Sequence, residues 1–396
     1  MSAPTPQRWA YPALMALVVV ALGTSGAPAP LYGIYAHDWG FAPLTTTIVF
    51  AAYAVAALVA VLVTGSISDR YGRKPVLLSA LALILVGLVV FMTAQGVGAL
   101  VLARVLHGLG VGATVVAATA ALLDLRPDDG QRTGQRTGVA FNVGIAAAIL
   151  GTAVIADVGP DPLVTPYLVL AALAVALFLL VAVMRETHRD ARTTRLHIAR
   201  PRVPRSISEH FRFSALGVMA SWSVLGVFLS LFPSIAARAV HAEHVLFGGA
   251  VVAASAGAAA VSQLVGGRWP AKPAAVVGDL GTGVFLLLAI PAVDSGNGWV
   301  IGAVSALLGF FFGLAFGGSL RHLTQHIPAA HRGEVMSAFY VLAYSAMAVP
   351  TVVAGWASTV WRPESVFAPF MVVVAAACAT AGLLGLRRPS RERVPA

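Results

Sequence analysis

Twelve long apolar segments, separated by short polar stretches, decide what this 396-residue chain can fold into. A helix needs about 20 apolar residues to cross a bilayer, and each segment is long enough. Only 11% of the residues are charged, whereas soluble domains carry about 25%. The chain is therefore predicted to be an all-α membrane protein with twelve transmembrane helices. The expected segments are 10–36, 42–64, 75–94, 98–123, 136–157, 163–184, 213–236, 245–266, 273–293, 298–320, 333–358 and 364–386.

The basic residues gather on one side of the predicted membrane. If the N-terminus is cytoplasmic, the inner connections hold 23 Arg and Lys and the outer connections hold two. The positive-inside rule then predicts a multi-pass protein of the cytoplasmic membrane with both termini in the cytoplasm. Because the cations lie in short membrane loops, the net charge of +10 does not indicate a nucleic-acid partner.

The segments fall into two sets of six. Residues 1–184 form the expected N-terminal half, 185–212 a basic cytoplasmic linker, and 213–396 the C-terminal half. A shift of 198 residues places 70–75 (RYGRKP) on 268–273 (RWPAKP), which indicates an internal repeat. Parallel repeats of this kind hold a substrate site between them near the membrane midplane. The linker is either a site for anionic lipid or a tether that only fixes topology.

No motif for a cofactor or a metal is evident. The single cysteine, Cys378, excludes an intrachain disulfide and a metal site built from cysteines. The chain has no G-x-x-x-x-G-K-[ST] motif, so we expect no P-loop ATP-binding site within it. No nucleophile–base pair or metal cluster stands out either. We therefore expect a protein that is not an enzyme and that needs no cofactor or metal.

The connection after the second segment, residues 65–75 (GSISDRYGRKP), is the most distinctive motif. We expect it to form a tight bend, because glycine turns freely at positive φ. It resembles the signature loop between helices 2 and 3 of the major facilitator superfamily of transporters, G-x-x-x-D-R-x-G-R-[KR]. The matching residues are Gly65, Asp69, Arg70, Gly72, Arg73 and Lys74. The resemblance implies a transporter fold in which this loop controls the conformational change, and we expect Asp69 to cap a helix of the other half.

The fourth segment carries an intramembrane cation. Arg104 is followed by His107 and a glycine-rich face, and this run resembles the helix-4 motif that the superfamily links to proton coupling. Intramembrane Arg is normally retained for function, although a structural role for Arg104 or His107 is also open. The resemblance further implies that Asp124, at the end of this segment, pairs with Arg70 or Arg73 as an inner gate.

The fifth segment has spaced glycines around Asn142, a candidate coupling or binding residue. Close helix packing alone explains these glycines, and the segment lacks the Gly-Pro of the drug/proton antiporter branch. Among the acids, only Asp279 is predicted within the membrane, on a helix that is usually peripheral in the family. Coupling is therefore expected to use Asp38, His107, the inner acids or the charge of the substrate.

Residues expected to line a cavity between the halves are mostly aromatic or weakly polar. They are Thr24, Tyr32, Trp222, Ser223, Phe312, Phe316, Tyr340 and Tyr344. A pocket with few charges suits amphipathic or lipophilic cargo. We predict a monomeric secondary transporter that works by alternating access and exports such small molecules, with proton antiport as the candidate coupling. Two alternatives stay open: uptake of a polar metabolite, such as a sugar or organic acid, and a non-transporting sensor or scaffold.

Overall fold

The computed structural model describes residues 7–188, 200–328 and 331–386. Within these ranges, 12 helices are long and apolar enough to cross a membrane, which confirms the predicted number of spans. Residues 189–199 of the linker and residues 387–396 at the C-terminus lie outside the described residues. The contact of the linker with anionic lipid therefore stays a prediction.

The elements of the first six spans run in chain order from one end of the bundle to the other and back. They are α1 (Ala10–Gly26), the short 3-10 helix η1 (Ala29–Leu31), α2 (Tyr32–Trp39), α3 (Pro43–Tyr71), α4 (Arg73–Met92), α5 (Val97–Leu125), η2 (Pro127–Asp129), α6 (Gly130–Val158) and α7 (Thr165–Val183). The elements of the last six spans are η3 (Arg205–Ile207), α8 (Ser208–Ser230), α9 (Phe232–Ala239), α10 (Val245–Gly266), α11 (Ala271–Asp294), α12 (Gly298–His326), α13 (Arg332–Val360) and α14 (Pro363–Leu386).

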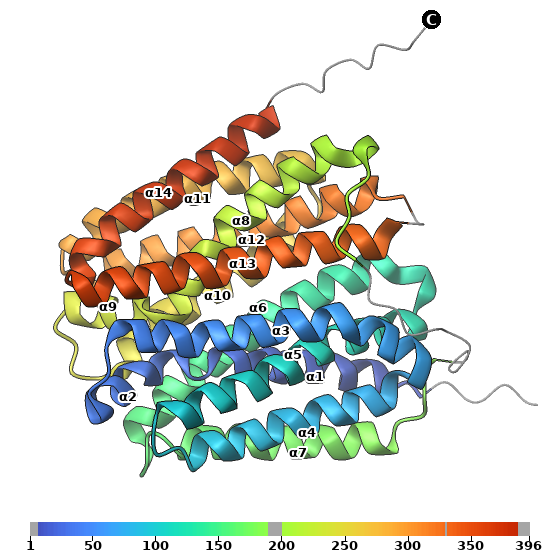
Figure 1. The fold of residues 1–396 in the computed structure, drawn as a ribbon, viewed down its shortest axis with the longest axis horizontal. Coiled ribbons are helices and arrows are strands. Elements are labelled where there is room, and N and C mark those ends of the chain that lie inside the picture. Colours follow the sequence, from blue (N-terminus) through green and yellow to red (C-terminus); the bar gives the residue numbers. More distant parts are fainter. Residues whose placement is uncertain (1–6, 189–199, 329–330, 387–396) are drawn as a thin grey trace, which may run out of the picture.

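The two sets of helices pack mainly among themselves (Figure 1). In the N-terminal set, α5 packs on α3 and α4, and α1 packs on α6. In the C-terminal set, α12 packs on α10 and α11, and α8 packs on α13 and α14. The sets meet along two helix pairs, α6 with α10 and α3 with α13. We call the end of the bundle that holds Gly72 and Glu334 the linker end, and the opposite end the far end.

The first span of each set is broken near the far end, where the sequence predicted unbroken helices over 10–36 and 213–236. After α1 ends at Gly26, a short 3-10 turn that follows Pro28 and contains Pro30 precedes α2. In the second set, α8 stops at Ser230 and α9 restarts with Pro233 at its second residue. Proline has no N–H to give to a helix and clashes with the preceding turn, so the helix restarts around it.

The signature segment is not the ten-residue bend that the sequence predicted. Helix α3 continues through Gly65 and Asp69 to Tyr71, and only Gly72 leaves the helical conformation, with φ of 98°. The Gly72 amide donates to the carbonyl of Ser68 at 3.0 Å and closes the last turn. Polar side chains beyond the apolar run therefore extend the helix, and one glycine makes the whole turn.

Small residues lie where helices approach most closely. Gly144 of α6 faces the Val19 carbonyl oxygen of α1 so closely that any side chain would clash with it. Gly355 of α13 lies against Thr47 of α3 in the same way, across the contact between the two sets. Membrane helices associate by close packing rather than by expelling water, so these glycines set the spacing of the bundle.

We expect Gly144→Ala to destabilise the protein and Gly151→Ala, on the same helix, to leave it unchanged or more stable. No atom lies within 4 Å of the position a side chain would take at Gly151, and alanine is favoured over glycine in a helix by about 1 kcal/mol. Overpacking at Gly144 costs about 1–3 kcal/mol. Thermal unfolding in detergent measures both, and equal midpoints for the two variants would contradict this packing.

Candidate functional site

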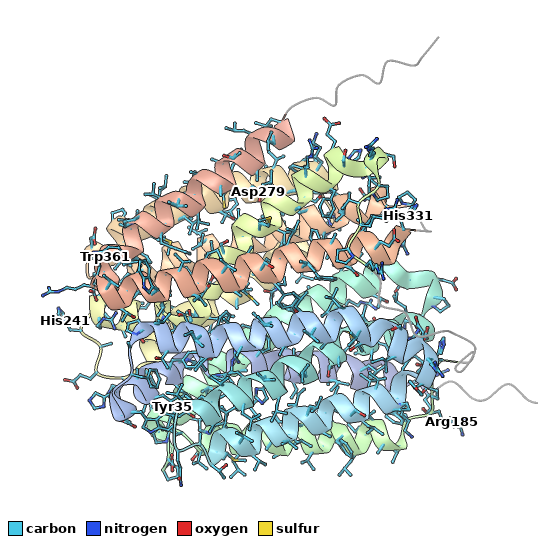
Figure 2. The ribbon with its side chains drawn as sticks, viewed as in Figure 1. Tyr35, Arg185, His241, Asp279, His331 and Trp361 are labelled. Atoms are coloured by element: carbon cyan, nitrogen blue, oxygen red, sulfur yellow. The ribbon has the colours of Figure 1, made fainter. Side chains whose placement is uncertain are left out.

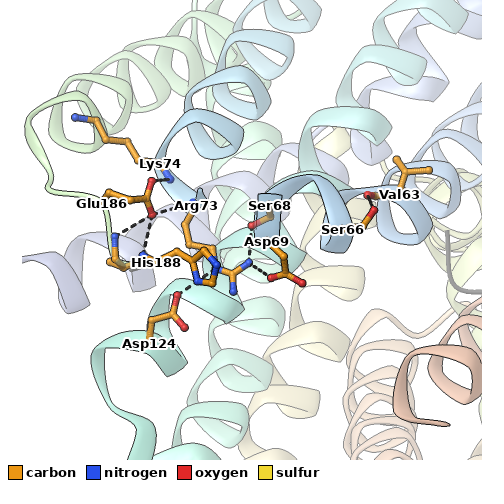
Figure 3. A network of polar contacts seen from close by, with 10 residues as sticks. Val63, Ser66, Ser68, Asp69, Arg73, Lys74, Asp124, Glu186 and His188 are labelled. Carbon is orange, nitrogen blue, oxygen red and sulfur yellow. Dashed lines mark hydrogen bonds and ion pairs between the residues drawn. The ribbon is translucent and has the colours of Figure 1, made fainter. Parts of the chain in front are cut away.

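Arg73 joins three helices at the linker end (Figure 3). It is the first residue of α4, and only 7% of it is exposed. Its Nε donates to Asp124 of α5 at 3.1 Å, and its Nη1 donates to Ser68 of α3 at 2.9 Å and to Asp69 of α3. A buried guanidinium with two carboxylates and a hydroxyl is charge-balanced and fixed in orientation.

These contacts show which of the partners expected for Asp124 and Asp69 are present in the structure. Asp124 pairs with Arg73, while the guanidinium of Arg70 lies 5.5 Å from the ring centre of Tyr71. Asp69 bonds Arg73 within its own set of helices, rather than capping a helix of the other set as predicted. Gly65 has no atom within 4 Å of its side-chain position, so it makes no close helix contact. The network therefore fastens α3, α4 and α5 to one another.

Glu186 completes this network, and the sequence analysis missed it. Its Oε1 accepts from the backbone amide of Arg73 and its Oε2 from that of Lys74, each at 2.9 Å. Carboxylates at helix N-termini satisfy free amides and oppose the helix dipole. A side chain at Gly72 would come within 2.5 Å of Glu186 Oε2. The available signal was an acid directly after the sixth span, which the sequence analysis assigned to the linker.

Arg104 is fully buried inside the N-terminal set. Its Nη1 donates to the carbonyl of Ser25 in α1 at 2.9 Å. Its guanidinium lies 4.4 Å from the ring centre of Tyr53 and 5.5 Å from that of Phe50, both on α3. Cation–π contacts of this kind are worth about 2 kcal/mol when desolvated. Arg104 therefore ties α5 to α1 and α3 without an ion pair among the described residues.

His107 lies away from the contact between the two sets. Its ring is fully buried, 5.2 Å from that of Phe91, and fills the space beside Gly87 of α4. Neither ring nitrogen has a hydrogen-bond partner among the described residues. His107 and Arg104 thus contact different helices, although they lie one turn apart on α5.

Asn142 and Phe312 line a small cavity of about 30 Å³ between the two sets, together with residues of α8 and α10. The Asn142 amide nitrogen donates to the Gly138 carbonyl at 3.0 Å. The other lining residues are apolar except Ser255; examples are Val224, Phe228 and Leu308. Such a volume holds about one or two waters, so the cavity is too small to hold a cargo molecule in this conformation.

Three of the remaining predicted lining residues form an aromatic cluster, and the others make local contacts or none. Trp222 lies 5.6 Å from Phe316 and 5.1 Å from Tyr344, ring centre to ring centre, and so joins α8, α12 and α13. Thr24 and Ser223 donate to carbonyls of their own helices, and Tyr340 packs beside Phe339. The buried Tyr32 hydroxyl has no partner among the described residues.

Asp279 of α11 is the buried acid of the C-terminal set (Figure 2). None of its surface is exposed, and neither carboxylate oxygen has a hydrogen-bond partner among the described residues. It faces the bare backbone of Gly217 on α8: a methyl there would lie 2.8 Å from Asp279 Oδ2 and 3.0 Å from Ser319 Oγ. The sequence analysis set Asp279 aside as peripheral, but the residue points into the interface of α8, α11 and α12.

Hydrogen bonds join the two sets of helices at both ends of the bundle, and two of them lie at the far end. The Leu44 amide of α3 donates to Thr359 Oγ1 of α13 at 3.1 Å, and the Val245 amide of α10 donates to Asp157 Oδ1 of α6 at 3.3 Å. At the linker end, Gln135 Nε2 of α6 donates to the Gln263 carbonyl of α10 at 3.1 Å. A cavity of about 500 Å³ opens beside this contact, lined by α1, α6 and Leu264.

Three histidines at the linker end, His210, His322 and His326, also lie together. The sequence analysis expected no metal cluster because it did not place His210 beside the pair on α12. Spacing alone could have paired His322 with His326, which are four residues apart on a helix.

Comparison with known proteins identifies the family. The family model of the Major Facilitator Superfamily matches residues 14–351. The chain belongs to this superfamily. Its members are transporters and not enzymes, so the resemblance of the signature segment and the prediction of no enzymatic activity are both confirmed.

Two relatives with different names, a multidrug resistance protein and a sugar-proton symporter, are similar to parts of this chain. The multidrug resistance protein MdtL of Escherichia coli is 28% identical over 187 residues, which cover 46% of this chain and 47% of that protein. The arabinose-proton symporter of Bacillus subtilis is 32% identical over 88 residues, which cover 22% of this chain and 18% of the symporter. The alignments thus span about half or less of these relatives.

Two solved structures share the fold over nearly the whole chain. The human organic anion transporter MFSD10 superposes with a TM-score of 0.71 at 16% identity, over 96% of this chain and 100% of that one. The nucleoside transporter NupG superposes with a TM-score of 0.70 at 13% identity, with the same coverage. These similarities support the fold alone.

We expect Arg104→Lys to insert and fold but to transport several-fold more slowly. Lysine can reach the Ser25 carbonyl, but it lacks the planar guanidinium that lies over Tyr53 and Phe50, and losing that contact removes about 1–2 kcal/mol. Arg268→Lys, at an exposed position between α10 and α11, is the control and should match the parent. Equal transport rates for both variants at equal expression would show that the ring contacts do not matter.

We expect Asp124→Asn to lower both stability and transport. It removes one charge from the Arg73 network, where hydrogen bonds to charged groups are worth about 1.5–3 kcal/mol. Asp129→Asn is a matched control, because both side chains are 27% exposed but Asp129 makes only loose ion pairs at 3.8 Å. Unfolding in detergent and transport rate at equal expression measure the difference; a larger effect at Asp129 would contradict the network.

Proposed function

We propose that this superfamily member exports small amphipathic or lipophilic molecules across the cytoplasmic membrane by alternating access, in exchange for protons. The observation that carries the proposal is the composition of the contact between the two sets of helices. An apolar cavity lies between the sets, and Asn142 is one of its two polar lining residues. The Trp222, Phe316 and Tyr344 rings pack together within the C-terminal set, and we propose that they border the cargo pathway. Such surfaces suit apolar cargo with one or two polar groups.

The proposed conformation is closed at the far end and open toward the linker end. Leu44–Thr359 and Val245–Asp157 hold the far end shut, and the 500 Å³ cavity lies at the other end. Opening the far end would break these contacts between the sets. The Arg73 network would move as part of one rigid body, since its bonds stay within the N-terminal set.

For the proton site we propose Asp279. A buried carboxylate that makes no hydrogen bond or ion pair among the described residues is expensive as an anion, so the neutral acid fits this conformation. Movement of α8 against α11 would expose the group to water and release the proton. His107 is a poorer candidate, because its ring is enclosed by α4 and α5 away from the contact between the sets.

The test uses everted membrane vesicles whose lumen is acidified by respiration. A lipophilic cationic dye, or in a second series a neutral one, is added to the outside solution. The parent should accumulate at least one dye, and an uncoupler should abolish the accumulation. Asp279→Asn should lose this proton-driven uptake but retain dye exchange down a gradient, because Asn fills the site without carrying a proton.

Asp294→Asn is the control, since Asp294 ends the same helix at the far end and is exposed. Full proton-driven uptake by Asp279→Asn would refute its role. Similarity to the arabinose-proton symporter favours a second candidate, uptake of a sugar with protons. Arabinose accumulation in right-side-out vesicles, without dye transport in everted ones, would replace the export proposal.

A further inference from the structure

We propose that His210, His322 and His326 form a binding site for a divalent transition-metal ion of the zinc type at the linker end of the C-terminal set. The site is separate from the transport pathway and does not depend on the proposed cargo. It would join α8, which carries His210, to α12, which carries the other two.

The three imidazoles are already close enough to share one ion. One ring nitrogen from each lies within 4.8 Å of the others, and His210 Nδ1 is 3.1 Å from His322 Nε2. Ligand nitrogens on a tetrahedral zinc lie about 3.4 Å apart, given Zn–N bonds of 2.0–2.1 Å. Rotation of the side chains, without movement of the helices, would therefore bring the nitrogens from their present spacing to that of a coordinated site.

Hydrogen bonding prepares His326 to act as a ligand. Its Nδ1 lies 2.8 Å from the carbonyl oxygen of His322. A carbonyl only accepts, so Nδ1 carries the hydrogen and Nε2 keeps a free lone pair. Metal-binding histidines usually donate their second nitrogen to a carbonyl or carboxylate in this manner. The ring of His326 is stacked on that of His210 at 3.8 Å between ring centres, so one of the two rings has to turn out of this stack before both can point at one ion.

The close approach of His210 to His322 indicates that at least one of these two rings is neutral. One nitrogen can donate to the lone pair of the other only if the second is unprotonated. A metal ion would replace the shared hydrogen and satisfy both lone pairs. His322 is 6% exposed, whereas His210 is half-buried and His326 is exposed, so an ion there would be shielded on one side and open to water on the other.

A cavity of about 580 Å³ lies beside the histidines and supplies an entry path and room for a water ligand. Its charged lining residues are Glu209 and Arg212 of α8 and Lys272 of α11. Arg321 on α12 is directed instead to the carbonyls of Gly266, Gly267 and Trp269. The nearby cations weaken attraction for any ion, and Glu209 partly offsets them, so affinity has to come from the imidazoles.

The donor set selects the class of ion. Three imidazoles and an open position suit Zn²⁺, Ni²⁺ or Cu²⁺, whereas Mg²⁺ and Ca²⁺ prefer oxygen ligands. Because the ligands come from two helices, a bound ion would fix α8 to α12 at the linker end and oppose their relative movement.

The test is titration of the detergent-purified full chain, prepared without a polyhistidine tag, with Co²⁺ and then Zn²⁺. The parent should bind Co²⁺ with the visible absorption of a four-coordinate site, and Zn²⁺ should displace it. His326→Gln and His322→Gln should each weaken binding by at least about tenfold, since even the outer partners of metal ligands contribute 10–100-fold. Metal binding displaces protons from the imidazoles, so affinity should fall at acidic pH.

His331→Gln is the control, because His331 lies at the same end but is bonded to Glu334 at 3.0 Å. It should bind Co²⁺ as the parent does. Zn²⁺ should also raise the unfolding temperature of the parent and the control, but not of the two site variants, which separates lost binding from lost folding. A parent that binds Co²⁺ no more tightly than His326→Gln would overturn the proposal, as would Mg²⁺ displacing Co²⁺ as well as Zn²⁺ does.

Discussion

The hydrocarbon core of a bilayer offers no water to a bare peptide group, so each backbone N–H and C=O in a crossing segment must be bonded within the protein. This constraint turns the apolar segments into continuous helices and leaves helix contacts to be made by shape. Gly144 against Val19 and Gly355 against Thr47 bring backbones together where larger residues would hold them apart. The first contact lies inside one set and the second lies between the sets, so the same packing rule builds both the rigid bodies and the surface on which they move.

The same absence of water makes two of the buried charged residues, Arg104 and Asp279, informative. Arg104 has a carbonyl acceptor and two aromatic faces, and these contacts hold α5 to its neighbours. Asp279 has no such partners among the described residues, and it lies against the backbone of Gly217. A charge with good partners stabilises one arrangement, whereas an acid without partners is suited to change its protonation when its surroundings change. This contrast is the physical basis for assigning structure to one and coupling to the other.

The linker end concentrates the polar chemistry of both sets. On one side, Arg73 binds two carboxylates while Glu186 caps the helix that begins with Arg73. On the other side, α8 and α12 bring three histidines beside a large cavity. Neither group bonds the opposite set, so each stiffens its own set of helices. Conformational change is then concentrated at the α3–α13 and α6–α10 contacts, where hydrogen bonds between the sets are few.

The sequence by itself determined the number of spans and the family, because the length of each apolar run and the six fixed positions of residues 65–74 are local properties. Through resemblance, it also gave Asp124 a partner in either Arg70 or Arg73, and the structure selected Arg73. Only the tertiary structure decided where Asp69 points, that Glu186 caps α4, that Asp279 faces α8, and that the three histidines lie together. Those outcomes depend on how far one helix is rotated and shifted against another. No periodicity within a single helix specifies that relation, since glycine contacts such as Gly217 with Asp279 join residues distant in the chain.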